Sequence, residues 1–298
     1  SQQIAETAGI PINRVTTLMT ALTTTGMVER SNEGETYANS PGAAAFLARG
    51  AKYEFGDYLR YQIDQQMYPL LEQLNQVLDG TLDSDSIDSY QHWMADPEQA
   101  LIYCEAQHAG SLGPGRTLAR LVDLSKAETL LDVGGGTGAM SIRLLENYPN
   151  LVSTIIDFPN VAEIGWQFIA KAGMVDRIRY IPSNALVAEW PKEQGAILMS
   201  YLFSGIPGEE VPRLIDYAFE CLEAGGSFMI HDFMVEDDRT GPPMAALWQL
   251  QHMAFTPEAR SVTPDWLRTR LQEAGFVDIQ EDGMIPGLTR LIHARKPG

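Results

Sequence analysis

The chain has 298 residues, of which 45% are hydrophobic and 20% charged, and this composition predicts a soluble globular protein of about two domains. The net charge of −18 argues against nucleic-acid binding, which needs a basic surface, and against docking on an anionic membrane. No apolar run reaches the roughly 18 residues of a spanning helix, and no signal peptide is visible. Cys104 and Cys221 lie in apolar helical contexts without zinc-site spacing, so we expect buried packing residues in a cytoplasmic protein.

Residues 1–50 predict a small helical module that ends in a hairpin. Its expected elements are two helices and a strand pair: Gln2–Ala8, Asn13–Thr25, and residues 26–30 with 35–38 around the turn Asn32-Glu33-Gly34. This order resembles a winged helix, whose second helix enters the DNA groove in a regulator. Here that helix carries Arg14 as its only cation. We therefore interpret the module as a packing or dimerisation unit and expect a homodimer.

Residues 51–126 predict a mainly helical linker or substrate-capping region, with helices over Tyr53–Leu78 and Asp96–Leu124. Aromatic and amide side chains gather in this region, and we interpret most of them as interhelical packing: Tyr58, Tyr61, Tyr68, Tyr90, His92, Trp93, Tyr103, Gln107 and His108. The stretch Gly110–Arg116 interrupts the helical pattern and predicts a glycine-rich bend. Arg116 on such a bend could bind a substrate carboxylate, or could be a solvated or ion-paired arginine.

From residue 127 to residue 298 strands alternate with helices, which predicts an α/β domain with a mostly parallel sheet. The expected strands are Thr129–Val133, Val152–Ile156, Ile178–Ile181, Ala196–Tyr201, Ser227–Val235 after the turn Glu223–Gly226, Val277–Glu281 and Thr289–Ala294. The last two should pair antiparallel through a turn over Gly283–Gly287. Helices are expected over Ala139–Asn147 and Pro243–Phe255.

The segment Leu130–Gly138 joins an apolar strand to a helix through a carboxylate and four glycines. A strand, a glycine turn and a helix bring bare backbone against a nucleotide-like ligand. Gly134, Gly136 and Ala139 also satisfy a dinucleotide fingerprint, so the turn alone leaves the cofactor open. Asp132, directly before the glycines, would repel a pyrophosphate but suits a cationic ammonium group. That carboxylate favours a cofactor other than a dinucleotide.

Polar side chains close the other predicted strands. The carboxyl ends of parallel strands form the ligand crevice of an open α/β sheet. The side chains expected at these ends are Asp132, Asp157, Asn184 and Ser200. Asp157 follows Gly138 by 19 residues, which suits a contact with ribose hydroxyls.

Three segments resemble the S-adenosylmethionine-dependent methyltransferases of the plant and hydroxyindole O-methyltransferase type: residues 132–138 (DVGGGTG), 157–161 (DFPNV) and 222–226 (LEAGG). The resemblance implies a winged-helix dimerisation domain followed by a Rossmann-like class I methyltransferase domain. It also implies a cofactor site for S-adenosylmethionine, with Gly134, Gly136 and Gly138 near its methionine part, Asp157 on the ribose and Phe158 on the adenine. Asn184 stands where the family usually has an aspartate near the adenine amine.

The chain departs from the family after its fourth strand. Members that methylate phenols carry a His-Asp pair there, with the histidine as general base, whereas Ser200–Glu210 contains no histidine. Glu209 or Glu210 could take that role. Two adjacent glutamates that open a helix are also typical of a solvated first turn.

A histidine appears instead at the end of the fifth strand, as His231-Asp232, and a second one, His252, lies on the following helix. Two histidines and a carboxylate suit a non-haem iron centre, with His231, His252 and Asp232 as candidate ligands and Gln251 as a weaker one. The 21-residue separation of the histidines is no standard metal spacing. The alternative is a hydrogen-bonded His231 and a packed His252.

The same residues resemble a subset of the family, the α-keto acid C-methyltransferases such as the phenylpyruvate enzyme. That resemblance implies Fe(II) or Fe(III) on His231 and His252, and Arg116 for the substrate carboxylate. Related methyltransferase domains of polyketide assembly lines act on carrier-bound substrates.

We therefore predict metal-assisted C-methylation next to a carbonyl of a keto acid or carrier-bound acyl substrate in secondary metabolism, with His231, Asp232, His252 and Arg116 as catalytic residues. One alternative is O-methylation of a phenol or other hydroxyl, with His231, His252 or Asp232 as base. Another is a methyltransferase-like protein that binds the cofactor without methyl transfer. Four apolar residues would hold a substrate tail or only pack the core: Phe203, Met244, Trp248 and Phe255.

Overall fold

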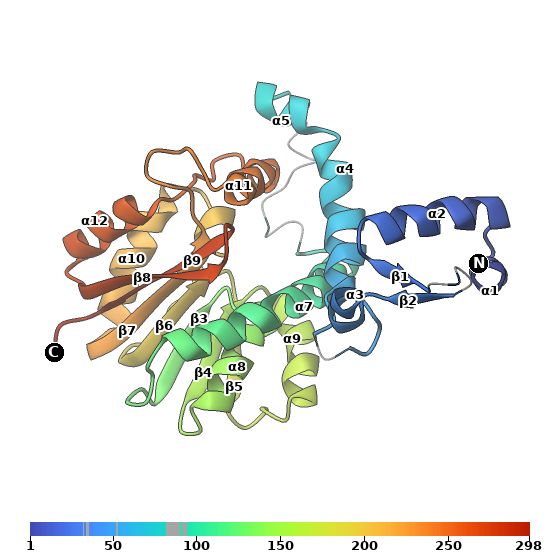
Figure 1. The fold of residues 1–298 in the computed structure, drawn as a ribbon. Coiled ribbons are helices and arrows are strands. Elements are labelled where there is room, and N and C mark those ends of the chain that lie inside the picture. Colours follow the sequence, from blue (N-terminus) through green and yellow to red (C-terminus); the bar gives the residue numbers. More distant parts are fainter. Residues whose placement is uncertain (32, 34–35, 52, 82–89, 91–93) are drawn as a thin grey trace. The chain divides into compact units, whose positions relative to one another are not determined.

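The computed structural model describes residues 1–31, 33, 36–51, 53–81, 90 and 94–298. The described chain forms two compact units, Ser1–Leu59 and Arg60–Gly298 (Figure 1). Among the described residues, no helix is long and apolar enough to cross a membrane. The predicted three-part division of the chain stays a prediction.

The first unit contains two helices, a strand pair and a third helix: α1 Gln2–Ala8, α2 Ile12–Thr24, β1 Val28–Arg30, β2 Tyr37–Asn39 and α3 Pro41–Phe46. Gly9 ends α1 in the left-handed conformation that glycine adopts without a steric penalty. Ala5, Val15 and Met19 form the small core. The strands pair antiparallel as predicted, while Asn32 and Gly34 of the predicted turn lie outside the described residues. The winged-helix interpretation and the homodimer stay predictions.

The predicted helix over Tyr53–Leu78 is broken into three: η1 Tyr58–Met67 with π-type hydrogen bonding, α4 Tyr68–Leu71 and α5 Leu74–Asp79. Pro69 at the start of α4 has no N–H to donate, so one continuous ladder of hydrogen bonds cannot run through this point. His92 and Trp93 of the predicted aromatic cluster lie outside the described residues.

Helix α7, Pro97–Leu121, runs without a break through the stretch Gly110–Arg116, so the predicted glycine-rich bend is wrong. The reason is close packing against α8, Ala139–Asn147. A Cβ on Gly115 would lie 2.9 Å from Cγ of Arg143, so the glycine lets the two helices approach. Burial of Pro114 in this contact compensates for the hydrogen bond that it cannot donate.

Residues 129–295 contain a seven-stranded sheet: β3 Thr129–Val133, β4 Val152–Asp157, β5 Ile178–Pro182, β6 Gln194–Ser200, β7 Leu222–Phe233, β8 Val277–Ile285 and β9 Thr289–Arg295. The spatial order is β5-β4-β3-β6-β7-β9-β8, and β9 is antiparallel to both of its neighbours. The predicted α/β, Rossmann-like fold with a mostly parallel sheet is confirmed. The predicted turn Glu223–Gly226 lies inside β7, where it shifts the register against β6.

Both faces of the sheet are covered by helices (Figure 1). Leu131 and Val133 of β3 pack with α10, Glu210–Cys221, and α12, Pro264–Ala274. Leu130 points to the opposite core, which contains α7, α8 and α9, Pro159–Lys171. The polar edge of the sheet lies at the carboxyl ends of β3, β4 and β6, which carry Asp132, Asp157 and Ser200.

Candidate active site

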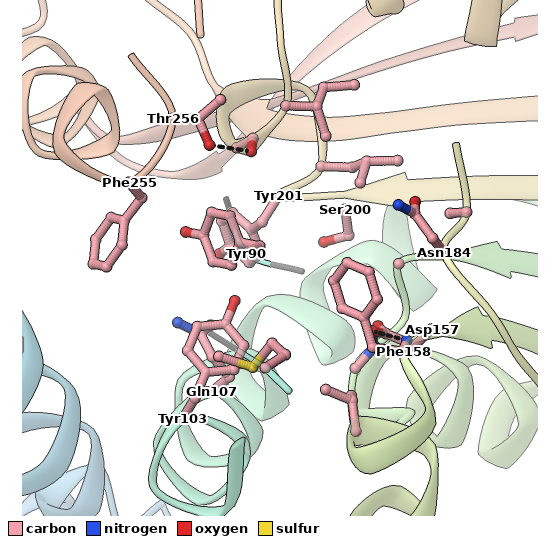
Figure 2. Close-up of a pocket in the computed structure, with 18 of the residues that line it drawn as sticks. Tyr90, Tyr103, Gln107, Asp157, Phe158, Asn184, Ser200, Tyr201, Phe255 and Thr256 are labelled. Atoms are coloured by element: carbon pink, nitrogen blue, oxygen red, sulfur yellow. Dashed lines mark hydrogen bonds between the residues drawn. The ribbon is translucent and has the colours of Figure 1, made fainter. Parts of the chain in front are cut away.

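A cavity of about 700 Å³ lies at the carboxyl ends of β3, β4 and β6 (Figure 2). One side, here called the glycine side, is formed by Asp132, residues 134–137, Ala139, residues 156–158, residues 184–186, and Ser200 with Tyr201. The other, the aromatic side, is formed chiefly by Tyr90, Met94, Tyr103, Gln107 and residues 255–258. All of these residues belong to the second compact unit.

The glycine loop is held from three directions. The Gly136 N–H donates to Oδ2 of Asp157 at 2.7 Å, and the Tyr180 hydroxyl donates to the Gly136 carbonyl at 2.7 Å. Nδ1 of His108 lies 2.8 Å from the Thr137 hydroxyl. Gly136 has a φ of 57°, and a Cβ built on it would meet no atom within 4 Å. The loop therefore presents bare backbone to open space, as a ligand cradle requires.

Two carboxylates face this side of the cavity, Asp132, which is buried, and Asp157, which is half-buried. Oδ2 of Asp132 accepts from the Ser141 hydroxyl at 2.6 Å, whereas Oδ1 is buried without a hydrogen-bond partner. Burial raises the pKa of Asp132 to about 7 and that of Asp157 to about 6. The hydrogen bonds that Asp157 accepts from the N–H groups of Gly136 and Phe158 act against its shift. A cationic ligand would favour the ionised form of both groups.

Most residues predicted to bind the cofactor line the cavity: Asp132, Gly134, Gly136, Asp157, Phe158, Asn184 and Ser200. Gly138 does not line it. It caps α8 with a φ of 76°, and a Cβ there would lie 2.9 Å from Cδ1 of Ile155. Gly138 thus allows the helix to pack closely on β4. The individual cofactor contacts stay predictions.

Aromatic rings from distant parts of the chain form the opposite side. Tyr90 stacks on Phe255 at a centroid distance of 5.5 Å and meets Tyr103 edge-on at 6.0 Å. Gln107 reaches the cavity wall, and its side-chain amide donates to the amide oxygen of Gln62. Among the described residues that line the cavity there is no lysine, arginine or histidine. The described residues of this side are therefore mainly aromatic and apolar, with Glu258 as their one charged side chain.

Of the four apolar residues expected to hold a substrate tail, only Phe255 lines the cavity. Phe203 is fully buried in the core, Trp248 stacks on Phe233 at 5.0 Å, and Met244 is 52% exposed. Tyr90 and Tyr103 were interpreted from the sequence as packing. Their positions within an aromatic and amide cluster were the only available signal.

The family is decided by comparison with known proteins. The model of the O-methyltransferase domain family matches residues 79–277. The chain belongs to this family. It is a methyltransferase that uses S-adenosylmethionine.

Its relatives match nearly the whole chain. It is 28% identical to the tetracenomycin polyketide synthesis 8-O-methyl transferase TcmO of Streptomyces glaucescens, over 99% of this chain and 86% of that protein. It is 27% identical to the 3-hydroxy-5-methyl-1-naphthoate 3-O-methyltransferase of Streptomyces sahachiroi, over 96% of this chain and 84% of that protein. The fold is similar to human N-acetylserotonin methyltransferase in complex with S-adenosylmethionine (SAM), with a TM-score of 0.86 at 18% identity, covering 99% and 86% of the two chains.

In this methyltransferase none of the predicted catalytic residues His231, Asp232, His252 and Arg116 lines the cavity. Nδ1 of His231 lies 2.9 Å from the Ser200 hydroxyl, and its Nε2 lies 3.0 Å from the Thr289 hydroxyl. The Asp232 carboxylate accepts from the N–H groups of Ser204 and Phe233 at 3.1 and 2.8 Å. His252 meets the Phe233 ring edge-on at 5.4 Å.

The predicted iron centre is not assembled. The described part of the chain contains no group of three His, Cys, Asp or Glu side chains arranged to hold a metal ion. Both ring nitrogens of His231 contact hydroxyls, so the lone pair of the unprotonated nitrogen is directed at a hydroxyl and not at a metal position. Burial lowers the pKa of His231 to about 3 and that of His252 to about 4, which keeps both rings neutral. Arg116 is half-buried in α7 and does not contribute to the cavity wall.

Proposed function

We propose that this methyltransferase methylates a hydroxyl oxygen of an uncharged aromatic small molecule. The observation that carries the proposal is the aromatic side, which offers stacked rings and, among its described residues, no cationic side chain. A keto acid would bring a carboxylate that finds no positive partner in this wall, and burying an unpaired charge is costly. The names of the two relatives, both O-methyltransferases, support an oxygen acceptor.

The glycine side suits the cofactor. Bound SAM supplies a methyl group on a positively charged sulfur. Asp132, with its unpartnered Oδ1, would attract the ammonium group, and Asp157 would accept from the ribose hydroxyls. Asp157 and Phe158 at the end of β4 would hold the adenosine, and the glycine loop with Ser200, at the ends of β3 and β6, would hold the methionine part. The neighbouring positions of these strands in the sheet support this division.

The aromatic side would orient the acceptor. A planar ring seated against Tyr90 and Phe255 gains stacking and apolar burial, and its hydroxyl is held towards the glycine side. Much of the rate enhancement would then come from proximity and orientation. We assign the hydroxyl proton to Glu258, because it is the only carboxylate among the described residues of the aromatic side. His231, His252 and Asp232 do not line the cavity, so they do not suit the role of base.

The test uses a matched pair of acceptors, 2-naphthol and a hydroxynaphthoate, together with phenylpyruvate. Methyl transfer from isotopically labelled SAM is followed by mass spectrometry, and the methylated atom is identified by NMR. We expect an aryl methyl ether as product. The value of kcat/KM should be at least about tenfold higher for 2-naphthol than for the hydroxynaphthoate, because the carboxylate of the latter would be buried without a cationic partner. A C-methylated keto acid, or a preference for the naphthoate, would contradict the proposal. Glu258→Gln should lower kcat and leave SAM affinity unchanged.

A further inference from the structure

His231 lies inside the sheet, directly behind the cavity wall. It pairs in register with Ser200 of β6 on one side and with Leu291 of β9 on the other, and it is fully buried. Thr289 precedes Leu291 by two residues and therefore points to the same face of the sheet. Ser200, His231 and Thr289 thus form a row of side chains across three adjacent strands.

Hydrogen bonds connect this row. The ring nitrogens of His231 contact the hydroxyls of Ser200 and Thr289 at 2.9 and 3.0 Å, and the Ile285 N–H donates to the Thr289 hydroxyl at 3.2 Å. A neutral imidazole offers one donor and one acceptor. Each ring nitrogen is therefore satisfied, and rotation of the ring would break two buried hydrogen bonds.

Ser200 joins the row to the cavity. It is the last residue of β6 and lines the cavity, where Figure 2 shows it beside Tyr201. Tyr201 adopts a φ of 58°, and its N–H donates to the His231 carbonyl at 2.8 Å. A strained backbone of this kind persists only where neighbouring contacts hold it. The end of β6 is thus tied to β7 by a backbone bond and by the Ser200–His231 bond.

We propose that His231 is a positioning residue that holds the Ser200 hydroxyl against the methionine part of bound SAM. The inference rests on the cofactor site of the proposed function. Ser200 ends β6, the strand next to β3, and β3 leads into the glycine loop, so both strand ends meet the same part of the ligand. The methionine part carries an ammonium and a carboxylate, and a hydroxyl can accept from the first or donate to the second.

The test is a double-mutant cycle on cofactor affinity. SAM dissociation constants are measured by calorimetry without any acceptor for Ser200→Ala, His231→Leu and the double variant. We expect each single change to weaken binding roughly fivefold to tenfold, as the loss of one hydrogen bond does. The double variant should bind no more weakly than Ser200→Ala alone, because His231 acts only through Ser200. Additive losses would overturn the proposal.

The far end of the row supplies a test that does not require a change at His231. Thr289 does not line the cavity, so it has no direct access to the ligand. Thr289→Val removes the hydroxyl at nearly constant volume and should raise the SAM dissociation constant about twofold to threefold. The control Thr289→Ser keeps the hydroxyl and should bind like the unmodified chain. Equal SAM dissociation constants for Thr289→Val and Thr289→Ser would overturn the proposal. This comparison remains decisive even if His231→Leu does not fold.

These measurements use no acceptor, so they separate this proposal from the assigned reaction. An error in the acceptor class would leave every dissociation constant as expected. Conversely, additive losses of SAM affinity in the cycle would overturn the role of His231 but would not change the expected product, an aryl methyl ether.

Discussion

The two sides of the cavity are built in different ways. The glycine side comes from strand ends between residues 132 and 201, and backbone hydrogen bonds and the carboxylates of Asp132 and Asp157 define it. The aromatic side collects Tyr90, Tyr103 and Phe255 from separate segments, and ring packing defines it. The first side repeats one local arrangement, a polar side chain at the carboxyl end of a strand, at β3, β4 and β6. The second depends on how distant helices and loops meet.

The difference follows from what each ligand demands. A cofactor of fixed structure needs charges and hydrogen bonds at fixed points, and strand ends supply these rigidly. An apolar acceptor needs mainly a shape, and many combinations of rings can supply one. We therefore expect changes on the glycine side to affect SAM binding, and changes on the aromatic side to affect the acceptor alone.

The largest effect is expected at Asp157. Its carboxylate accepts from Gly136 and Phe158, and Asp157→Ala removes both of these bonds together with any contact to the ribose. Hydrogen bonds to charged groups contribute about 1.5–3 kcal/mol each, so the SAM dissociation constant should rise roughly hundredfold. Calorimetry is the measurement, and Asp123→Ala, at an exposed position, is the control. An unchanged constant in a folded variant would remove Asp157 from the site.

At Asp132 the expected effect is smaller and depends on pH. An aspartate with a raised native pKa holds a proton that the unfolded chain releases near pH 4. The unfolding free energy of the ligand-free protein should therefore fall as the pH rises from about 4 to 7, while affinity for cationic SAM rises over the same range. Asp132→Asn should flatten both profiles and weaken SAM binding about tenfold at pH 8.

Thermal unfolding and calorimetry between pH 5 and 8.5 test this expectation, with the exposed Asp176→Asn as control. An Asp132→Asn variant whose pH profiles match those of the unmodified chain would assign the titration to another group.

On the aromatic side, Phe255→Leu should spare the cofactor. It removes the ring stacked on Tyr90 but keeps most of the buried apolar volume. An aromatic pair contributes about 0.5–1.5 kcal/mol beyond its buried area, so kcat/KM for 2-naphthol should fall about tenfold while SAM affinity stays constant. Steady-state kinetics check this, with Trp266→Leu, a 41% exposed site, as control. Weaker SAM binding would show that the two sides are not independent.

The smallest expected effect is that of chelation. Both nitrogens of His231 contact hydroxyls, so treatment with a strong iron chelator should leave activity within about twofold, whereas removal of a catalytic metal ion would abolish it. Activity before and after treatment is compared, and added iron serves as the control. A loss of activity that added iron restores would support the predicted metal centre.

Most of the correct predictions rest on residues that are close together in the sequence. The strand Thr129–Val133, the helix Ala139–Asn147 and the carboxylates at the strand ends were visible because period, glycines and polar side chains lie next to one another. The state of His231 was not visible, because it depends on Thr289, which lies 58 residues away. The continuity of α7 through Pro114 likewise depends on close packing with α8, and the sequence of α7 alone does not predict that packing.

The contact between Tyr180 and the glycine loop links two further positions. A Cβ on Gly165 in α9 would lie 2.0 Å from the Tyr180 hydroxyl, the group that holds the Gly136 carbonyl. A larger residue at 165 and a tyrosine at 180 therefore exclude each other as long as the ring keeps this place. We therefore expect the two sites to covary among related chains. The residue at position 165 of α9 thus helps to determine the position of the glycine loop, through Tyr180.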